Sequence, residues 1–141
     1  MAELDITRSI EIKAPTARVW AALTEPDLIA QWFGDSAEFD PIPGGTGSFG
    51  WKEHGTFRVL IEHVDIPKTL VYRWAREFDA DPVPGNSTLV RFDLAEIEGG
   101  TLLTMLETGF EELSDSQSAR EDNVKGWLSE LGDLVEFLES Q

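Results

Sequence analysis

Apolar and polar positions alternate along this chain with two different periods, and the period changes at residues that interrupt secondary structure. Residues 4–13 alternate in steps of two, which is typical of a half-buried strand. Pro15 ends this pattern, because proline cannot donate to a strand ladder and its fixed φ suits the first turn of a helix. Val19, Trp20 and Leu23 then share one helical stripe, so a strand followed by a short helix is predicted.

A second short helix is expected directly afterwards. Its apolar stripe consists of Leu28, Ile29, Trp32 and Phe33, and Gly34 is placed to end it. Neither helix is long enough to be stable alone, so both must pack on a larger body.

From residue 39 to 110 the period is two, which predicts strands joined by turns. The pair Gly99-Gly100 is typical of a tight hairpin. His63 follows Glu62 where the alternation slips, which indicates a bulge. The last strand, about 101–110, is apolar on both faces in its first half, so its register stays open.

After Ser114 the period becomes helical, and the apolar positions recur at steps of three and four: Val124, Trp127, Leu128, Leu131, Leu134, Val135 and Leu138. Acidic residues, Glu130 among them, fill the remaining faces of this helix. Strands joined by tight turns pair antiparallel, and a twisted sheet of this kind curls around the one element long enough to cover it.

The predicted fold is therefore α+β: a curved antiparallel sheet of about six to seven strands wrapped around a long C-terminal helix, with two short helices after the first strand. Trp20, Trp32 and Phe33 are expected to form a wedge where the sheet and the long helix splay apart. A chain of 141 residues fits a single domain over 1–141.

Composition narrows the function mainly by exclusion. The net charge of −16 repels phosphate backbones, so no nucleic-acid partner is expected. No apolar run has the length of a membrane span and the N-terminus lacks a signal core, so we predict no membrane insertion and a cytoplasmic location. The absence of cysteine removes disulfides, thiol catalysis and thiolate metal sites.

Two apparent motifs are interpreted as ordinary structure. Residues 45–50 have the G-x-G-x-x-G spacing of a dinucleotide site, which needs a strand before it and a helix after it. Here Pro41 and Pro43 precede the segment and an alternating aromatic strand follows, so a glycine-rich turn is predicted. His54 and His63 are too few for a metal centre. We therefore predict neither a cofactor nor a metal.

The order of elements resembles the helix-grip fold of the START/Bet v allergen superfamily, also called SRPBCC. Within it, the chain resembles the branch named for activators of the heat-shock-protein-ninety ATPase. The matching segments cover nearly the whole chain: "IEIKAPTARVWAALTEPDLIAQWFG", "DPIPGGTGSFGW", "TLVYRW", "STLVRFDL", "GGTLLTMLETGF" and "GWLSELGDLVEFLE". Many members of this branch carry a His-Ser or similar pair before the last Gly-Phe, where this chain has Glu107-Thr108.

The resemblance implies a mostly apolar cavity between helix and sheet. The inward-facing residues that we expect to line it are Trp32, Phe33, Phe57, Tyr72, Trp74, Phe92, Met105, Trp127 and Leu131. Tyr72, or Glu107 if its register turns it inward, brings polarity into this cavity. Desolvation then raises the pKa of Glu107, which makes it the candidate general acid or base.

Three functions remain open. The first is a small-molecule binding protein for a hydrophobic ligand such as a lipid, an aromatic compound or a polyketide. The second is an enzyme of the aromatase or cyclase kind that uses Glu107 or Tyr72. The third is an interaction module with a chaperone partner, as the name of the branch implies. The sequence does not decide the oligomeric state.

Overall fold

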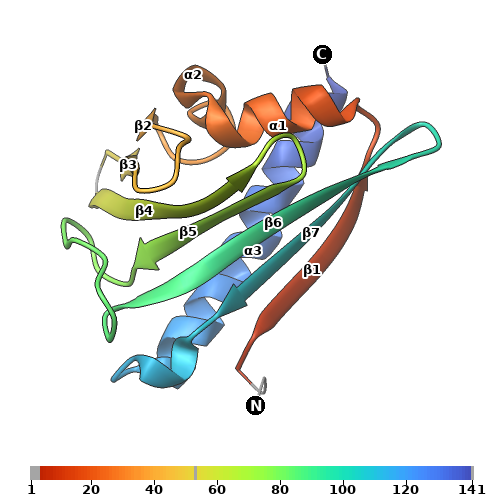
Figure 1. Ribbon diagram of the computed structural model, residues 1–141. Helices are drawn as coiled ribbons and strands as arrows, with labels where there is room; N and C mark the ends of the chain where they lie inside the picture. Colours follow the sequence, from red (N-terminus) through yellow and green to blue (C-terminus); the bar gives the residue numbers. More distant parts are fainter. Residues whose placement is uncertain (1–3, 53, 141) are drawn as a thin grey trace.

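Seven antiparallel strands form one curved sheet, and a long helix crosses the face toward which the sheet curls (Figure 1). The computed structural model describes residues 4–52 and 54–140, so residues 1–3, 53 and 141 of the predicted 1–141 domain lie outside the described part. In chain order the elements are β1 (Ile6–Ile12), α1 (Thr16–Thr24), α2 (Pro26–Ile29), β2 (Ser36–Phe39), β3 (Thr46–Trp51), β4 (Gly55–Asp65), β5 (Thr69–Ala75), β6 (Ser87–Ile97), β7 (Gly100–Thr108), the 3-10 helix η1 (Phe110–Glu112) and α3 (Ser116–Glu139). This architecture confirms the predicted α+β helix-grip fold.

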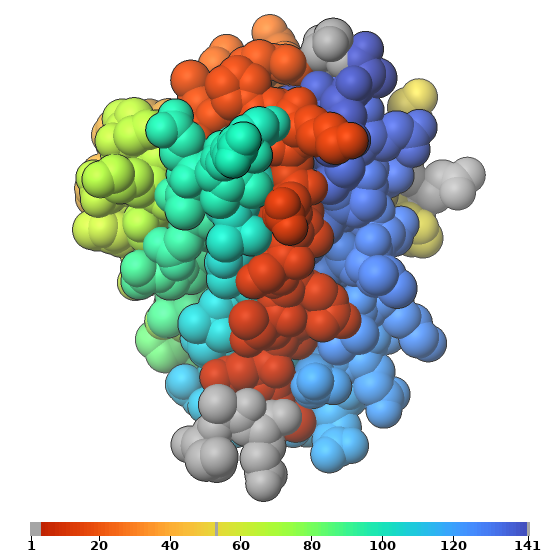
Figure 2. Space-filling model, turned by 90° about the vertical axis from the view of Figure 1, so that its right-hand side faces the viewer, coloured from red at the N-terminus to blue at the C-terminus, as the bar shows by residue number. Residues whose placement is uncertain are grey.

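The strand order β1-β7-β6-β5-β4-β3-β2 follows from the short connections. From β2 onward each strand pairs with the next one along the chain, whereas β1 pairs with β7 at the far edge. Figure 2 shows β1 as a strip between α3 on one side and the β6–β7 hairpin on the other. The backbone N–H of Lys13, just after β1, donates to Oε2 of Glu139 at 3.0 Å and links the strand end to the end of α3.

The register of β7, which the sequence left open, is set by pairing on both sides. Glu107 lies opposite Val90 of β6 and Ile6 of β1, both of which are buried on the helix-facing side. Thr101, Leu103, Met105 and Glu107 therefore point toward α3. An ionisable side chain, Glu107, is thus placed in the core of the molecule.

The slip of the alternation in β4 is a bulge, as predicted. Ile61 pairs with Tyr72, but the next partner of β5, Val71, pairs with His63 rather than Glu62. The extra residue bends β4 and increases the curl of the sheet around α3.

The second helix is shorter than the sequence predicted. α2 ends at Ile29, because the amides of Gln31 and Trp32 bond to carbonyls three residues back and tighten the chain into a turn. Trp32 and Phe33 follow the helix instead of lying on it, and both are buried. The indole Nε1–H of Trp32 donates to the carbonyl of Ala22 at 2.8 Å, which ties this turn to α1.

Phe33 is the centre of an aromatic cluster that joins the sheet to α3. Its ring lies 4.9 Å from Phe49, 5.6 Å from Trp74 and 5.7 Å from Trp127, and the last pair is stacked with planes 6° apart. Phe33, one of the three residues predicted to form a wedge, therefore joins the sheet to α3, and the ring of Trp32 lies 4.9 Å from it. None of the helices in the described part of the chain is both long and apolar enough to cross a bilayer.

Candidate functional site

A pocket of about 350 Å³ lies between α3 and the β3–β5 side of the sheet. Aromatic side chains form most of its wall: Phe33, Trp51, Phe57, Trp74, Phe78 and Trp127. The remaining lining residues are Arg76, Asp122, Asn123, Gly126 and Glu130. An apolar wall with a few polar groups, at this size, is typical of small-molecule sites.

The strands present the aromatic wall through their alternation. Phe57 of β4 lies 4.8 Å from Trp74 of the neighbouring strand β5 and 5.6 Å from Trp51 of β3, measured between ring centroids. Phe57 also stacks on Phe78 at 4.1 Å. Phe78 comes from the loop between β5 and β6, so this loop completes the wall on the outer side of the pocket.

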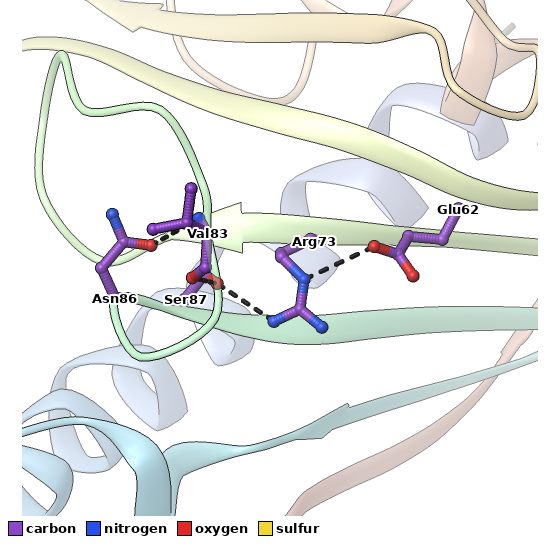
Figure 3. Close-up of polar contacts among 5 residues, drawn as sticks. All are labelled: Glu62, Arg73, Val83, Asn86 and Ser87. Carbon is purple, nitrogen blue, oxygen red and sulfur yellow. Dashed lines mark hydrogen bonds and ion pairs between the residues drawn. The ribbon is translucent and has the colours of Figure 1, made fainter.

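The loop that carries Phe78 is anchored at its C-terminal end by polar contacts on the outer face of the sheet (Figure 3). Arg73 of β5 donates to Oε2 of Glu62 at 3.4 Å and to the hydroxyl of Ser87 at 3.1 Å. The backbone N–H of Val83 donates to Oδ1 of Asn86 at 2.8 Å, and the Ser87 hydroxyl donates to the Val83 carbonyl. These bonds fix the base of the loop relative to β5.

Arg76 forms the polar end of the pocket and connects the sheet to α3. Its guanidinium contacts Asp115 at 2.9 Å, just before α3, and Asp122 at 3.0 Å, within α3. The Arg76 side chain is 24% exposed. Its charge is therefore engaged by two carboxylates before any ligand arrives.

Glu107 lies directly behind the wall of the pocket. Its Oε1 accepts a 2.7 Å hydrogen bond from Nε1 of Trp127, and its Oε2 accepts from the Thr88 hydroxyl at 2.5 Å and from Nδ2 of Asn123 at 2.9 Å. The side chain is fully buried, and desolvation raises the pKa of this carboxyl although the three donors and Arg76 oppose the shift. Both Trp127 and Asn123 line the pocket, so Glu107 orients two of its wall residues.

Tyr72 shares the inward-facing row of Glu107 but not the pocket. The row runs from Tyr72 of β5 through Val90 of β6 to Glu107 of β7. Burial, and secondarily the charge of Glu107, raise the pKa of the Tyr72 hydroxyl well above its usual value. At neutral pH this tyrosine is therefore a neutral, buried side chain.

Glu130 is, besides Asp122, the second carboxyl group of α3 that lines the pocket. Its Oε2 is buried and forms no hydrogen bond with any residue of the described part of the chain. Desolvation, and secondarily the charge of Asp133, raise the pKa of Glu130 to about 7. Glu130 and Trp51 also line a second pocket of about 440 Å³ beside the first, together with Trp32.

The structure separates the predicted cavity residues into three groups. Phe33, Phe57, Trp74 and Trp127 line the aromatic pocket. Trp32 lines the neighbouring pocket. The remaining four are buried in the core beneath the pocket: Tyr72, Phe92, Met105 and Leu131. A role of any of them in ligand binding stays a prediction.

Several lining residues were not identified from the sequence. Phe78 lies in a loop, where no periodicity assigns a direction to its side chain. Glu130 was placed with the polar faces of the helix, but it follows Trp127 by three residues and so lies beside it on α3. The three-residue spacing from Trp127 was the one sequence feature that could have identified Glu130 as a lining residue. Within residues 4–52 and 54–140, no three His, Asp or Glu side chains are arranged to hold a metal ion.

Several solved structures superpose on this chain over nearly its whole length. The solved structure of protein MLL2253 from Mesorhizobium loti superposes with a TM-score of 0.84 at 27% identity, over 97% of this chain and 98% of that one. DynU16, a protein in the dynemicin biosynthetic locus, matches with a TM-score of 0.81 at 25% identity, over 97% of this chain but 48% of its own length. The Aha1 dimer from Colwellia psychrerythraea matches with a TM-score of 0.78 at 23% identity, over 96% of each chain, and shows the shared fold alone.

No curated protein matches the sequence of this chain. Residues 13–139, however, match the family described as Activator of Hsp90 ATPase homolog 1-like protein. The match extends from the end of β1 to the end of α3 and so includes every residue that lines the aromatic pocket. The chain therefore belongs to the Activator of Hsp90 ATPase homolog 1-like family.

Proposed function

We propose that this protein binds a small, largely apolar molecule in the pocket between α3 and β3–β5. The observation that carries the proposal is a space of about 350 Å³ bounded by six aromatic side chains and only a few polar ones. Exposed aromatic surface is costly to hydrate, so a ligand that covers it gains free energy roughly in proportion to the area buried. The likeness to DynU16, which is found in a biosynthetic locus, also favours a small-molecule ligand.

An enzymatic function with Glu107 or Tyr72 as the proton carrier has less support. Neither residue is among those that line the pocket. The Glu107 carboxylate already accepts three hydrogen bonds, one of them from the Trp127 indole that separates it from the pocket. Its geometry favours a positioning role for Glu107 within a binding protein.

A chaperone partner rests on the family description alone. A pull-down with the ninety-kilodalton heat-shock chaperone of the same organism and an ATPase measurement would test it. An unchanged ATPase rate removes this alternative.

Gly126 offers a direct test of the binding proposal. It lies on α3, it lines the pocket, and a Cβ built on it meets no atom within 4 Å. Gly126→Leu therefore adds a side chain at the pocket, starting from a Cβ position that has open space around it. Gly132 is the matched control, because it also lies on α3 with open space around a Cβ but does not line this pocket.

The experiment screens lipids, aromatic compounds and polyketides against the wild-type protein by thermal shift and native mass spectrometry. A compound that stabilises the wild type and Gly132→Leu but not Gly126→Leu supports the proposal, because only the occupied site is blocked. Compounds that stabilise all three proteins equally bind elsewhere. Either that result or a complete lack of binding overturns the proposal.

A further inference from the structure

We infer that the ligand of the aromatic pocket is an organic cation, with an ammonium group on an apolar body, and that Glu130 receives the positive charge. This inference rests on the proposed function and specifies the class of ligand. Three independent features of the pocket support it: its charge balance, the unpaired carboxylate oxygen and the aromatic faces.

The charge balance of the pocket is negative. Arg76 is the one cation among its described lining residues, and it is already engaged by Asp115 and Asp122. Glu130 is therefore the lining carboxyl group without a cationic partner, and it is charged once the pH exceeds its pKa of about 7. An anionic ligand would meet this carboxylate without a free guanidinium to compensate, whereas a cation would be attracted.

Among the described residues that line the two pockets, none but Arg76 adds a positive charge near Glu130. On its own helix, Asp122 lines the same pocket, while Asp133 and Glu136 line the neighbouring one. From the other elements, Asp35 after α2 lines the neighbouring pocket and Arg76 after β5 lines the aromatic one. Apart from the engaged Arg76, every described charged residue that lines either pocket is acidic.

Glu130 Oε2 also lacks a hydrogen-bond donor. It is shielded from solvent and has no partner in the described residues, which is a costly arrangement for a carboxylate oxygen. A positive charge in the pocket would stabilise this carboxylate electrostatically, also when the ligand is a quaternary ammonium with no N–H to donate. The remaining buried carboxylate of the site, Glu107, is by contrast saturated with three donors.

The aromatic wall suits a cation as well as an apolar body. The indoles of Trp51, Trp74 and Trp127 all line the pocket, and tryptophan is the best aromatic partner for a cation. A cation over such a face is attracted by the negative face of the ring, and the attraction strengthens as the cation is desolvated. The net charge of −16 also raises the local concentration of cations around the whole molecule.

The test uses three probes of similar shape: benzyltrimethylammonium, its neutral carbon isostere 2,2-dimethylpropylbenzene, and the anion phenylacetate. Binding is followed at pH 8 by chemical-shift changes of the tryptophan indole N–H groups. We expect the cation to bind about tenfold more tightly than the neutral isostere, since a carboxylate and cation–π contacts act together, and the anion to bind least.

Glu130→Gln should lower the affinity for the cation about tenfold and leave the neutral probe unchanged. Glu121→Gln, at an exposed position of the same helix, is the control and should change neither. The cation carries a permanent charge, so its affinity for the wild type should rise between pH 5.5 and pH 8 as Glu130 ionises, and this rise should vanish in Glu130→Gln.

The outcomes distinguish the inference from the proposed function. Equal binding of the cation and the neutral isostere, blocked by Gly126→Leu, overturns the cation preference and leaves a general apolar site. Cation binding that persists unchanged in Glu130→Gln also overturns the inference. Failure of every probe to bind the wild type counts against both proposals.

Discussion

The indole Nε1–H of Trp127 on α3 donates a 2.7 Å hydrogen bond to Oε1 of Glu107 on β7. The same indole ring stacks on Phe33 at 5.7 Å and lines the aromatic pocket. One side chain thus connects a buried charge, the aromatic cluster and the pocket wall. Because a charge-assisted hydrogen bond holds the indole in one orientation, the shape of the pocket depends on a carboxylate that the pocket itself does not expose.

Replacing Glu107 should destabilise the fold to a degree that depends on the replacement. Glu107→Leu removes the acceptor for Thr88, Asn123 and Trp127 at once. Since each buried donor left unpaired costs about 1–3 kcal/mol, we expect the free energy of unfolding to fall by about 3 kcal/mol or more. Glu107→Gln retains one acceptor and should cost about 1–2 kcal/mol. Urea denaturation at pH 7 measures both, and an equal cost would contradict this account.

The difference in the free energy of unfolding between the wild type and Glu107→Gln should decrease as the pH rises. Because the pKa of Glu107 is raised in the folded state, the folded protein binds a proton that the unfolded chain releases near 4.5. The stability of the wild type relative to Glu107→Gln is therefore greatest below pH 4.5 and declines as the pH rises through the folded pKa. The Thr88 hydroxyl can reverse its bond to accept this proton. A stability advantage of the wild type over Glu107→Gln that grows with rising pH would contradict this prediction.

The helices and strands of the fold could be predicted because one side of each packs on the core, which places apolar residues at a regular spacing. α3 buries Trp127, Leu131, Leu134 and Leu138 at helical steps although Leu128 of the predicted stripe is exposed, and β5 alternates from Leu70 to Trp74. The direction of Glu107 could not be predicted, since Leu102 and Leu103 are both apolar and the register depends on pairing with β6 and β1. Local periodicity does not contain that information.

The pocket was still harder to predict because its rim comes from positions that a core analysis passes over. Phe78 lies in a loop, Gly126 has no side chain, and Glu130 resembles the solvated acidic residues of its helix. The sequence predicted Phe33, Phe57, Trp74 and Trp127 of the wall, but neither Trp51 nor Phe78. It also did not predict that the void lies at the β3–β5 side of α3. That position follows from packing between segments far apart in the chain.

Filling the pocket at Gly126 should not harm the fold. Glycine within a helix is less favourable than leucine by about 0.5–1 kcal/mol, and a Cβ at Gly126 or Gly132 meets no neighbour within 4 Å. Both Gly126→Leu and Gly132→Leu should therefore raise the free energy of unfolding by about 0.5–1 kcal/mol. Denaturant titration without ligand checks this. A loss of stability in Gly126→Leu alone would show that the space beside it is not open.

Ionisation of Glu130 should destabilise the protein above neutral pH. Its pKa is raised to about 7, so the folded state holds a proton that the unfolded chain releases near 4.5. The stability contributed by the neutral form is complete below pH 4.5 and is lost as the pH rises through 7. Because the side chain is only half-buried, solvent screening reduces the effect to about 1 kcal/mol.

Glu130→Gln should accordingly be more stable than the wild type at pH 8 and no more stable at pH 4. The exposed Glu121→Gln corrects for the general benefit of removing one negative charge from a chain of −16. A direct titration of the Glu130 carboxyl by carbon NMR provides the midpoint. A midpoint near 4.5 in the wild type would remove the basis of this prediction.

The turn that presents Phe33 depends on a glycine. Gly34 has a φ of +76°, and a Cβ there would lie 2.6 Å from the carbonyl oxygen of Gly50. Gly85 has a φ of +99° but open space around the Cβ position. Gly85→Ala should cost about 1 kcal/mol from the backbone alone, and Gly34→Ala about 2–3 kcal/mol because the clash adds to it. Equal losses of stability in the two variants, measured by thermal denaturation, would show that the backbone at position 34 moves away from Gly50 at no cost.

Arg76 should stabilise the junction between β5 and α3 more than an exposed ion pair does. It contacts Asp115 at 2.9 Å and Asp122 at 3.0 Å with a largely shielded side chain, whereas Arg91 pairs with Asp93 on the same strand and is half exposed. Arg76→Met should lower the free energy of unfolding by about 1 kcal/mol or more, and Arg91→Met by less than about 0.5 kcal/mol.

A second measurement separates the electrostatic role of Arg76 from loss of packing. Its positive charge opposes the raised pKa of Glu107, so Arg76→Met should shift the titration of Glu107 further upward. The protein with Glu107 loses stability relative to Glu107→Gln as the pH rises. When both proteins carry Arg76→Met, this loss should continue to a higher pH. Arg76→Lys keeps the charge and should leave that range nearly unchanged, even if its single ammonium cannot bridge both aspartates. If methionine and lysine at position 76 give the same titration, Arg76 acts on this site through packing and not through its charge.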